Sequence, residues 1–204
     1  MSQLSENKIA ELTTKGKRTR QKILDTAEQI FGEKGYFETS VAEITLTAGV
    51  AQGTFYNYFP TKKAVFEELI KQLSSNFRYE IKVAMEKEQS FEAKQRAGYQ
   101  AFFEWLISHR NLYSIIQQSV LVDQALYRWY YDKIATGFIK SIELAIDNKE
   151  CKPLNSETVA YCLMGIGQFI GMRWIYWDDK SVPDTVFDEA MELIFKGLNH
   201  TLEG

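Results

Sequence analysis

Apolar residues recur at three- and four-residue spacing along nearly the whole chain of 204 residues. This is the period of an amphipathic helix, and no alternating run of convincing length for a strand interrupts it. Proline, which ends helices, occurs only at Pro60, Pro153 and Pro183. The pattern therefore predicts an all-α fold with few breaks between its helices.

The first part of the chain predicts a small helical unit. An apolar stripe from Lys17 to about Lys34 ends at Gly35, where a left-handed cap would close the helix. Ser40 with Glu43 three residues later is a capping-box arrangement that starts a second, short helix. Gly49 can take the positive φ of a sharp turn, so this helix is predicted to end there.

A third helix, from about Ala51 to Phe59, completes the unit. Two short helices joined by a tight glycine turn form a helix-turn-helix. Pro60 ends this element, and Thr61 is the predicted N-cap of a long helix that reaches to about Glu88. Later helices are predicted from about Phe91 to His109, Leu112 to Val122, Gln124 to Asn148, Glu157 to Asp178 and Asp184 to Thr201.

Aromatic residues crowd the third short helix. At about 100° per residue, Phe55 and Phe59 point to the same side and are predicted to be core. The opposite arc holds Gly53, Thr54 and Asn57, with Tyr56 and Tyr58 on its flanks. A helix that lies in the major groove presents such an arc to bases and phosphates. Gly53 weakens a helix by about 1 kcal/mol relative to alanine, which suits a backbone that must approach a partner closely.

Local charge supports DNA binding although the whole chain is acidic. The net charge of −3 argues against a general nucleic-acid coat. Lys15, Lys17, Arg18, Arg20 and Lys22, however, cluster without an intervening acid, and Lys62 and Lys63 follow the reader helix. We expect these cations to contact phosphates, which gives affinity without sequence specificity. A solvated basic helix end is the alternative interpretation.

From Arg20 to Leu69 the sequence resembles the N-terminal DNA-binding domain of the TetR/AcrR family of transcriptional regulators. The resemblance runs through Ile23, Ala27, Phe31, Gly35, Ser40, Val41, Ile44, Ala48, Gly49, Val50, Gly53, Thr54, Tyr56, Tyr58, Phe59, Lys62 and Val65. It implies DNA contacts from Gln52, Gly53, Thr54, Tyr56 and Tyr58, and a phosphate contact from Lys62. The sequence departs from the family at Ala51, where a serine cap is frequent, and at Ala42, where some relatives carry arginine.

The predicted DNA-binding residues follow from the helix projection, the basic cluster and the resemblance together. They are Lys17, Arg18, Arg20, Ser40, Val41, Gln52, Gly53, Thr54, Tyr56, Asn57, Tyr58 and Lys62.

The rest of the chain is rich in tyrosine and tryptophan, whose apolar rings and polar tips suit a small-molecule cavity between helices. The predicted ligand-binding residues are Phe102, Trp105, Leu106, Tyr113, Gln117, Tyr127, Tyr130, Tyr131, Gln168, Phe169, Met172 and Arg173. The effector is expected to be apolar or aromatic. Arg173 needs a partner, and an internal pair with Asp132 or Asp178 is favoured over an anionic ligand.

Small residues in the segment GIGQFIG, Gly165 to Gly171, allow close helix approach. The last helix carries an apolar stripe of Met191, Ile194, Phe195 and Leu198. Because the last two long helices form the dimer interface in the family, the resemblance implies a homodimer. A symmetric dimer would present two reader helices to half-sites one turn of DNA apart.

Other classes of protein lack support in the sequence. Cys151 and Cys162 have no metal-ligand spacing, His109 and His200 are isolated, and we expect no catalytic residue, metal or cofactor. The N-terminus lacks a signal peptide, and no apolar run is long enough for a membrane span. We therefore expect a cytoplasmic protein without membrane contact.

These observations predict a ligand-responsive, DNA-binding transcriptional regulator, with a repressor as the expected form and an activator left open. Its expected parts are a flexible tail (residues 1–16), a helix-turn-helix DNA-binding domain (17–63) and a ligand-binding and dimerisation domain (64–204). The alternatives are a helical enzyme that uses the cavity, which lacks a nucleophile and base, and an adaptor whose head binds protein instead of DNA.

Overall fold

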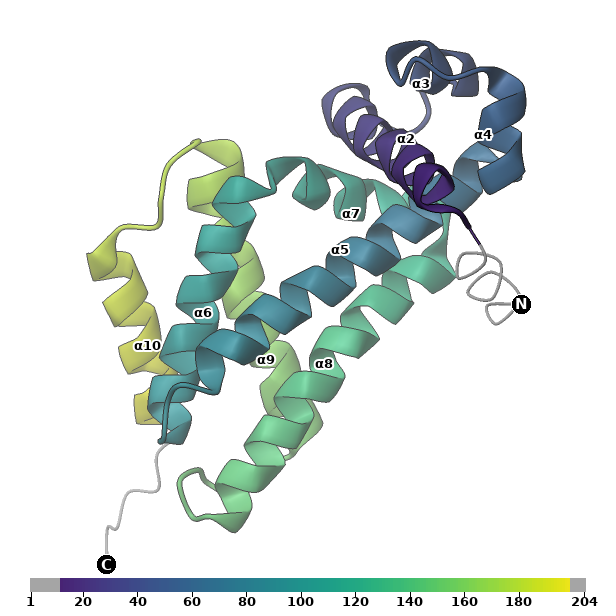
Figure 1. Ribbon diagram of the computed structural model, residues 1–204. Helices are drawn as coiled ribbons and strands as arrows, with labels where there is room; N and C mark the ends of the chain where they lie inside the picture. The colour runs from purple at the N-terminus through teal and green to yellow at the C-terminus, as the bar shows by residue number, and fades with distance from the viewer. Residues whose placement is uncertain (1–11, 199–204) are drawn as a thin grey trace, which may run out of the picture.

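The computed structural model describes residues 12–198, and every regular element in that range is a helix. Figure 1 shows α2, α3 and α4 gathered at one end of the molecule, with α5 running from this end into a larger bundle. We call residues 12–61 the head and residues 62–198 the body. The helices are α2 (Thr14–Lys34), α3 (Val41–Thr47), α4 (Gln52–Tyr58), α5 (Lys62–Met85), α6 (Phe91–Ser108), α7 (Arg110–Val122), α8 (Gln124–Asp147), α9 (Ser156–Ile170), the π-helix η1 (Gly171–Trp177) and α10 (Asp184–Leu198).

The first helix begins earlier than predicted. The Thr13 side chain accepts a hydrogen bond from the Gly16 amide at 3.1 Å, so α2 starts at Thr14 instead of Lys17. Residues 1–11 of the predicted tail lie outside the described residues, whereas residues 14–16 belong to α2. None of the helices within residues 12–198 has the length and apolarity that a bilayer crossing demands.

Two glycines shape the head. Gly49 has φ of 62° at the turn between α3 and α4, as predicted. Gly35 also has positive φ, 88°, but its ψ of 160° lies outside the left-handed helical region that was expected. Both conformations strain a residue that carries a Cβ atom, so these positions favour glycine.

Side-chain caps set the starts of α3 and α5. Ser40 Oγ accepts a hydrogen bond from the Glu43 amide at 3.1 Å, and Thr61 Oγ1 accepts one from the Ala64 amide at 3.0 Å. The Glu43 carboxylate pairs with Lys34, so it does not complete the capping box. Ala51 provides no side-chain cap for α4, as the sequence indicated.

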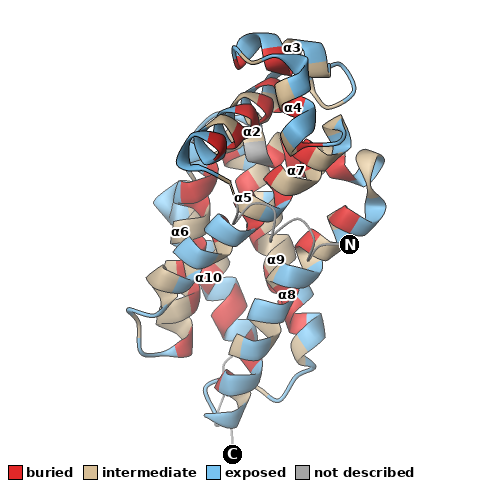
Figure 2. Cartoon of the chain, turned by 45° about the vertical axis from the view of Figure 1, so that its right-hand side comes forward, coloured by how far each residue is buried: buried red, intermediate tan, exposed pale blue. Residues whose placement is uncertain are grey.

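Figure 2 shows buried residues continuing from the head into the body without a break. One core cluster joins Phe31 and Phe55 of the head to Phe66 and Phe77 along α5. A second cluster lies farther from the head, among α6, α8, α9 and α10. Helix α5 therefore contributes to the core of both the head and the body.

The helix predicted from Glu157 to Asp178 changes character at Gly171, where α9 gives way to η1. A Cβ atom at Gly167 would lie 2.9 Å from Tyr99 Cε1, and one at Gly171 would lie 2.8 Å from Leu106 Cδ2. These glycines therefore let α9 and η1 approach α6 of the same chain.

The apolar stripe of α10 also packs within its own chain. Met191, Ile194, Phe195 and Leu198 are each at most 7% exposed and belong to the second core cluster. The interpretation of this stripe as a dimer surface is therefore wrong. Residues 199–201, which complete the predicted last helix, and His200 among them, lie outside the described residues.

Helix α7 is, after α5, the second helix that connects the head to the body. Gln118 Oε1 accepts a hydrogen bond from the Tyr36 amide at 2.6 Å, and Gln118 Nε2 donates to the Phe31 carbonyl at 3.3 Å. Both contacts hold the end of α2, so α5 and α7 together fix the position of the head.

Candidate DNA-binding surface and ligand cavity

The reader helix α4 divides as its sequence predicts. Phe55 and Phe59 are 0% and 3% exposed and belong to the core. Tyr56 is 53% exposed, while Gln52, Gly53 and Asn57 are exposed and Thr54 is half-buried. The structure therefore brings most of the predicted base-reading residues to one outward surface of α4.

Gly53 lies in open space. A Cβ atom at this position would have no neighbour within 4 Å, and the backbone φ is not positive. The fold of the free chain therefore does not require glycine here. This observation leaves close approach to an external partner as a reason for the residue.

Tyr58 has a structural role as well as an outward edge. Its ring is half-buried against the core of the head. Its hydroxyl lies 3.4 Å from the position that a Cβ atom of Gly16 would occupy. Tyr58 thus packs α4 against the start of α2.

Exposed cations of α2 lie beside the reader helix. Lys17, Arg18 and Lys22 are exposed. Lys22 Nζ lies 3.7 Å from the Cβ position at Gly49, which places its charge at the turn before α4. Lys22 thus adds positive charge suited to phosphates next to α4, and the phosphate contacts of Lys17 and Arg18 stay a prediction.

Arg20 does not belong to this surface. It is 8% exposed, its Nη2 atom lies 3.0 Å from Glu68 Oε1, and its guanidinium lies 4.8 Å from the centre of the Phe59 ring. The prediction of a DNA contact is wrong because the arginine is already paired inside the protein, where it links α2 to α5.

Lys62 is also occupied within the chain. Its ammonium donates to the carbonyls of Tyr36 at 2.7 Å and Thr39 at 2.6 Å and lies 4.2 Å from the centre of the Tyr36 ring. Burial lowers its pKa. The structure thus contradicts an outward, phosphate-binding Lys62. Its neighbour Lys63 pairs with Asp123 at 2.7 Å.

Ser40 and Val41 take mainly structural positions. The Ser40 hydroxyl is used as the N-cap of α3, although the residue is exposed. Val41 is half-buried against the core of the head. Val41 offers no polar group for reading bases, whereas the exposed Ser40 hydroxyl still has a hydrogen to donate.

A cavity of about 690 Å³ lies among α5, α6, α8 and α9. Four of the predicted ligand-binding residues line it: Phe102, Tyr130, Tyr131 and Gln168. Burial raises the pKa values of Tyr130 and Tyr131, so both phenols stay neutral. A cavity lined partly by aromatic side chains therefore lies between helices, while ligand binding by these residues stays a prediction.

Cations outnumber acids in the lining of this cavity. Its charged residues are Arg78, Lys82, Lys94, Lys133, Lys140 and Glu86. Lys82, Lys133 and Lys140 are exposed and so mark where the cavity meets solvent, whereas Tyr99 and Tyr130 are buried. The arrangement combines an apolar interior with a positive opening, which suits an amphiphile with an anionic head group.

The remaining predicted ligand residues lie elsewhere. Leu106, Tyr113, Gln117, Tyr127, Phe169, Met172 and Arg173 do not line this cavity, and Trp105 lines a different pocket. Phe169 is 66% exposed on α9. Arg173 pairs with Asp178, one of the two internal partners that were favoured.

Tyr113 contributes indirectly to the cavity. Its hydroxyl accepts a hydrogen bond at 2.8 Å from Nε2 of Gln168, which lines the cavity. Burial raises the pKa of Tyr113 to about 12. This neutral phenol therefore orients the amide that faces the cavity.

Sequence reasoning missed the contribution of α5 to the lining. Phe77, Ile81 and Met85 recur at four-residue spacing on one face of α5 and line the cavity. The same spacing is typical of core residues, so it gave no sign of empty space beside them. The lysines of α8 gave a signal, because Lys133 and Lys140 lie seven residues apart on one face.

Comparison with known proteins identifies a matching family and several relatives. Residues 23–69 match the family described as bacterial regulatory proteins, tetR family. The HTH-type transcriptional regulator YvdT of Bacillus subtilis (strain 168) is 27% identical over 149 residues, which cover 72% of this chain and 77% of YvdT. The fatty acid metabolism regulator protein of the same organism is 23% identical over 183 residues, covering 87% and 94% of the two chains.

The solved structures agree on the fold. The transcriptional regulator FadR from Bacillus subtilis, in complex with stearoyl-CoA, has a TM-score of 0.78 at 21% identity and covers 87% of this chain and 98% of its own. A tetR-family regulator from Shewanella sp. PV-4 has a TM-score of 0.75 at 20% identity, with coverage of 88% and 97%. Residues 23–69 therefore form a DNA-binding domain of the tetR family of bacterial regulatory proteins, and the whole chain shares the fold of solved tetR-family regulators.

Proposed function

We propose that the protein is a homodimeric repressor that leaves its operator when an anionic amphiphile with a long apolar chain occupies the body. The observation that carries this proposal is the cavity of about 690 Å³, whose interior is apolar and whose charged lining residues are cationic except for Glu86. Apolar burial would hold the chain of the effector, and the lysines would attract its head group.

Long-chain acyl thioesters of coenzyme A fit this description. They join an alkyl chain to a head group that carries several phosphates. The relative FadR was solved with stearoyl-CoA bound, and another relative is a fatty acid metabolism regulator. The effector class proposed from the sequence was apolar or aromatic; the lysines at the opening add a requirement for negative charge.

On the DNA side, we propose that Gln52, Gly53, Tyr56 and Asn57 enter the major groove. Thr54 and the outer edge of Tyr58 would border this contact. Lys17, Arg18 and Lys22 would bind the flanking phosphates, whereas Arg20 and Lys62 would hold the head in place from within. The phosphate contacts make binding salt-dependent, which separates this proposal from a protein-binding head.

The link between the two sites is α5. Its second half lines the cavity through Phe77, Ile81 and Met85. Its first half holds the head through Lys62 and Glu68. An effector that favours a shifted α5 would change the separation of the two reader helices and so lower operator affinity, provided that it binds the shifted state more tightly.

Dimerisation would use the outer face of α9, η1 and α10. Tyr161, Phe169, Trp177 and Leu193 are 47%, 66%, 62% and 71% exposed on these elements. Aromatic side chains that are exposed in the single chain and become buried on association are typical anchors of stable interfaces. Phe169→Asp is expected to yield monomers in sedimentation experiments and to weaken operator binding, while Tyr79→Asp, on α5, leaves the dimer intact.

We propose a regulator without catalytic activity that works in the bacterial cytoplasm, where its operator is found. The cavity lining contains no histidine, cysteine or aspartate, so it offers no nucleophile and base pair of the kind that hydrolases use.

The test is release of DNA by defined effectors. Operator DNA selected from a random pool would be bound to the purified protein, and anisotropy would follow additions of palmitoyl-CoA, free coenzyme A and hexadecanol. We expect release by palmitoyl-CoA only. Lys94→Ala combined with Lys133→Ala should raise the concentration needed, whereas Lys196→Ala, on α10, should not.

Two results would contradict the proposal separately. Equal release by hexadecanol would remove the role of the lysines. Undiminished DNA binding by Tyr56→Ala and Asn57→Ala would remove α4 as the reader, whatever the effector does.

A further inference from the structure

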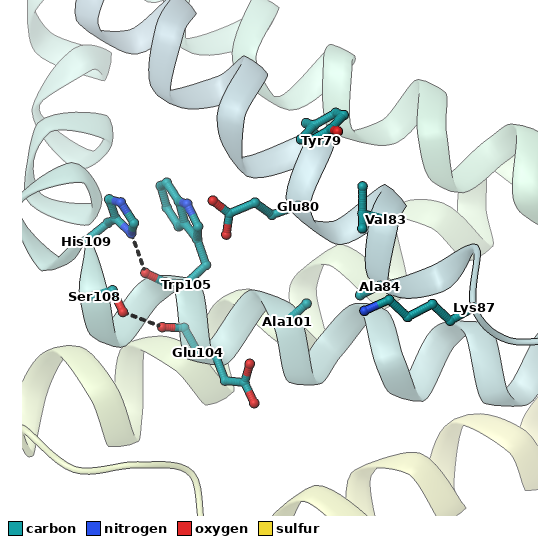
Figure 3. A pocket seen from close by; sticks show the side chains of 10 residues that line it. All are labelled: Tyr79, Glu80, Val83, Ala84, Lys87, Ala101, Glu104, Trp105, Ser108 and His109. Carbon is teal, nitrogen blue, oxygen red and sulfur yellow. Dashed lines mark hydrogen bonds between the residues drawn. The ribbon is translucent and has the colours of Figure 1, made fainter.

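A second pocket, of about 450 Å³, lies on the outer side of the seam between α5 and α6. Figure 3 shows its parts: Trp105 of α6 and His109, just after the end of α6, stand side by side, and the Glu80 carboxylate extends from α5 toward Trp105. Small side chains, Ala84 and Ala101, form the floor between the helices.

Trp105 holds an unused hydrogen-bond donor beside this pocket. The residue is 4% exposed, and its Nε1 atom is buried without a hydrogen-bond partner within residues 12–198. A buried donor left unpaired costs about 1–3 kcal/mol. The indole is fixed by stacking on His109, with ring centres 4.3 Å apart and an interplanar angle of 10°. A ligand that carries an acceptor would satisfy this donor.

The charge of the pocket calls for a cation. Glu80 and Glu104 both line it, and neither forms an ion pair within the described part of the chain. Lys87 is the only lysine or arginine in the lining. The cavity described above has the opposite balance, with five cationic residues and one acid in its lining. The two spaces therefore select ligands of opposite charge.

We propose that this second pocket binds a small organic cation that also carries a hydrogen-bond acceptor. Its ammonium group pairs with the Glu80 carboxylate, and the exposed Glu104 adds negative charge to the lining. Its oxygen accepts from Trp105 Nε1, and its apolar part covers the alanine floor. The exposed ring of Tyr79 adds a π face that attracts a cation. This inference goes beyond the proposed function and does not depend on the effector of the larger cavity.

The pocket is also placed to influence the rest of the molecule. The Trp105 ring lies 5.0 Å from that of Phe77, which lines the larger cavity. His109 connects α6 to α7, the helix that holds the end of α2. His109 is also close enough to α2 to oppose the rise that burial causes in the pKa of Glu28. A ligand bound in this pocket would thus contact Trp105, which packs against Phe77 in the lining of the larger cavity.

Three matched probes test the proposal by calorimetric titration of the full chain. The probes are 2-phenoxyethylamine, 3-phenylpropylamine, in which a methylene replaces the ether oxygen, and the neutral 2-phenoxyethanol. We expect saturable binding of the first with a Kd of about 1 mM, as is ordinary for a ligand of this size. The carbon analogue should bind several-fold more weakly, and the alcohol should bind more weakly still.

Variants locate the site. Glu80→Gln and Glu104→Gln are each expected to lower the affinity for 2-phenoxyethylamine by up to about fivefold, the usual range for an exposed charge pair. Trp105→Phe should remove the difference between the ether and its carbon analogue. Glu86→Gln, which changes the acid of the larger cavity, is the matched control and should leave the affinity unchanged.

Several outcomes would overturn the proposal. Absence of saturable binding by both amines would do so, as would equal loss of affinity in Glu86→Gln and Glu80→Gln. An unchanged preference for the ether in Trp105→Phe would remove the role assigned to the indole. Because the titration requires neither DNA nor an acyl thioester, its failure is distinguishable from a failure of the proposed function.

Discussion

The head and the body use glycine for different physical reasons. In the head, Gly35 and Gly49 have positive φ, a requirement of the local backbone. In the body, Gly167 and Gly171 have ordinary helical backbones but leave room for Tyr99 and Leu106 of another helix. The turns of the head are thus specified by short stretches of sequence, whereas the close helix packing of the body depends on residues far apart in the chain.

The largest expected effect separates core from surface within one helix of the head. Phe55→Ala should destabilise the protein by about 3–5 kcal/mol, because the ring is fully buried. Tyr56→Ala, its exposed neighbour, should change stability by less than about 0.5 kcal/mol while weakening operator binding. Denaturant unfolding and anisotropy measure the two properties. Equal destabilisation by both variants would show that α4 is not divided in this way.

In the body, the comparison is made between two glycines of α9. Gly167→Ala brings a methyl group against Tyr99 and should destabilise by roughly 1–3 kcal/mol through overpacking. Gly165→Ala meets no atom within 4 Å and should stabilise by up to about 1 kcal/mol through helix propensity. Thermal unfolding distinguishes the two. A gain at both positions would mean that α9 and α6 are not held closely together.

Two lysines test which charges of the DNA-binding region are internal. Lys62→Met leaves the carbonyls of Tyr36 and Thr39 without their donor and should destabilise by about 1–2 kcal/mol. Lys17→Met should leave stability unchanged and reduce the salt dependence of operator binding. The internal role of Lys62 would be disproved if Lys62→Met altered the salt dependence of operator binding and left the stability unchanged.

The contact that joins α5 to α8 should respond to acid. Lys63 hydrogen-bonds Asp123, and together with the Leu126 amide it lowers the pKa of Asp123 below its ordinary value of 3.8. The stabilisation is therefore present above pH 3.8 and is lost as pH falls through the lower, folded value. Asp123→Ala should cost about 1 kcal/mol near pH 7, mainly as a lost N-cap. Its deficit relative to the wild type should shrink in unfolding curves measured below pH 3.8.

The smallest effect concerns Gly53. Because a Cβ atom there meets nothing, Gly53→Ala should stabilise the free protein by up to about 1 kcal/mol. We expect the same methyl group to weaken operator binding by hindering the approach of α4. Ala51→Ser, which adds a cap, is the control that stabilises α4 without filling that space. Unweakened DNA binding by Gly53→Ala would show that the backbone does not approach DNA closely.

The difference between local and long-range interactions explains how much of the fold and of the candidate site could be predicted from the sequence. The helical period alone separated Phe55 from Tyr56, and the turn at Gly49 followed from local chemistry. The internal roles of Arg20 and Lys62 could not be predicted in this way, because their partners lie far along the chain. The sequence around a cationic residue does not indicate which acceptor it will contact. Of the cavity, the aromatic residues Phe102, Tyr130 and Tyr131 were predicted. The α5 lining was not, because a residue beside a void follows the same period as one beside a neighbour.

The π-helical segment from Gly171 to Trp177 has a consequence for evolution. Its hydrogen bonds span one residue more than those of an α-helix. Loss of a single residue here would restore the α-helical pattern and rotate the exposed Tyr176 and Trp177 about the helix axis. Under the proposed mode of dimerisation, genes that arise by duplication could in this way acquire mutually incompatible surfaces in one step, so that each product would pair only with itself while its cavity stays unchanged.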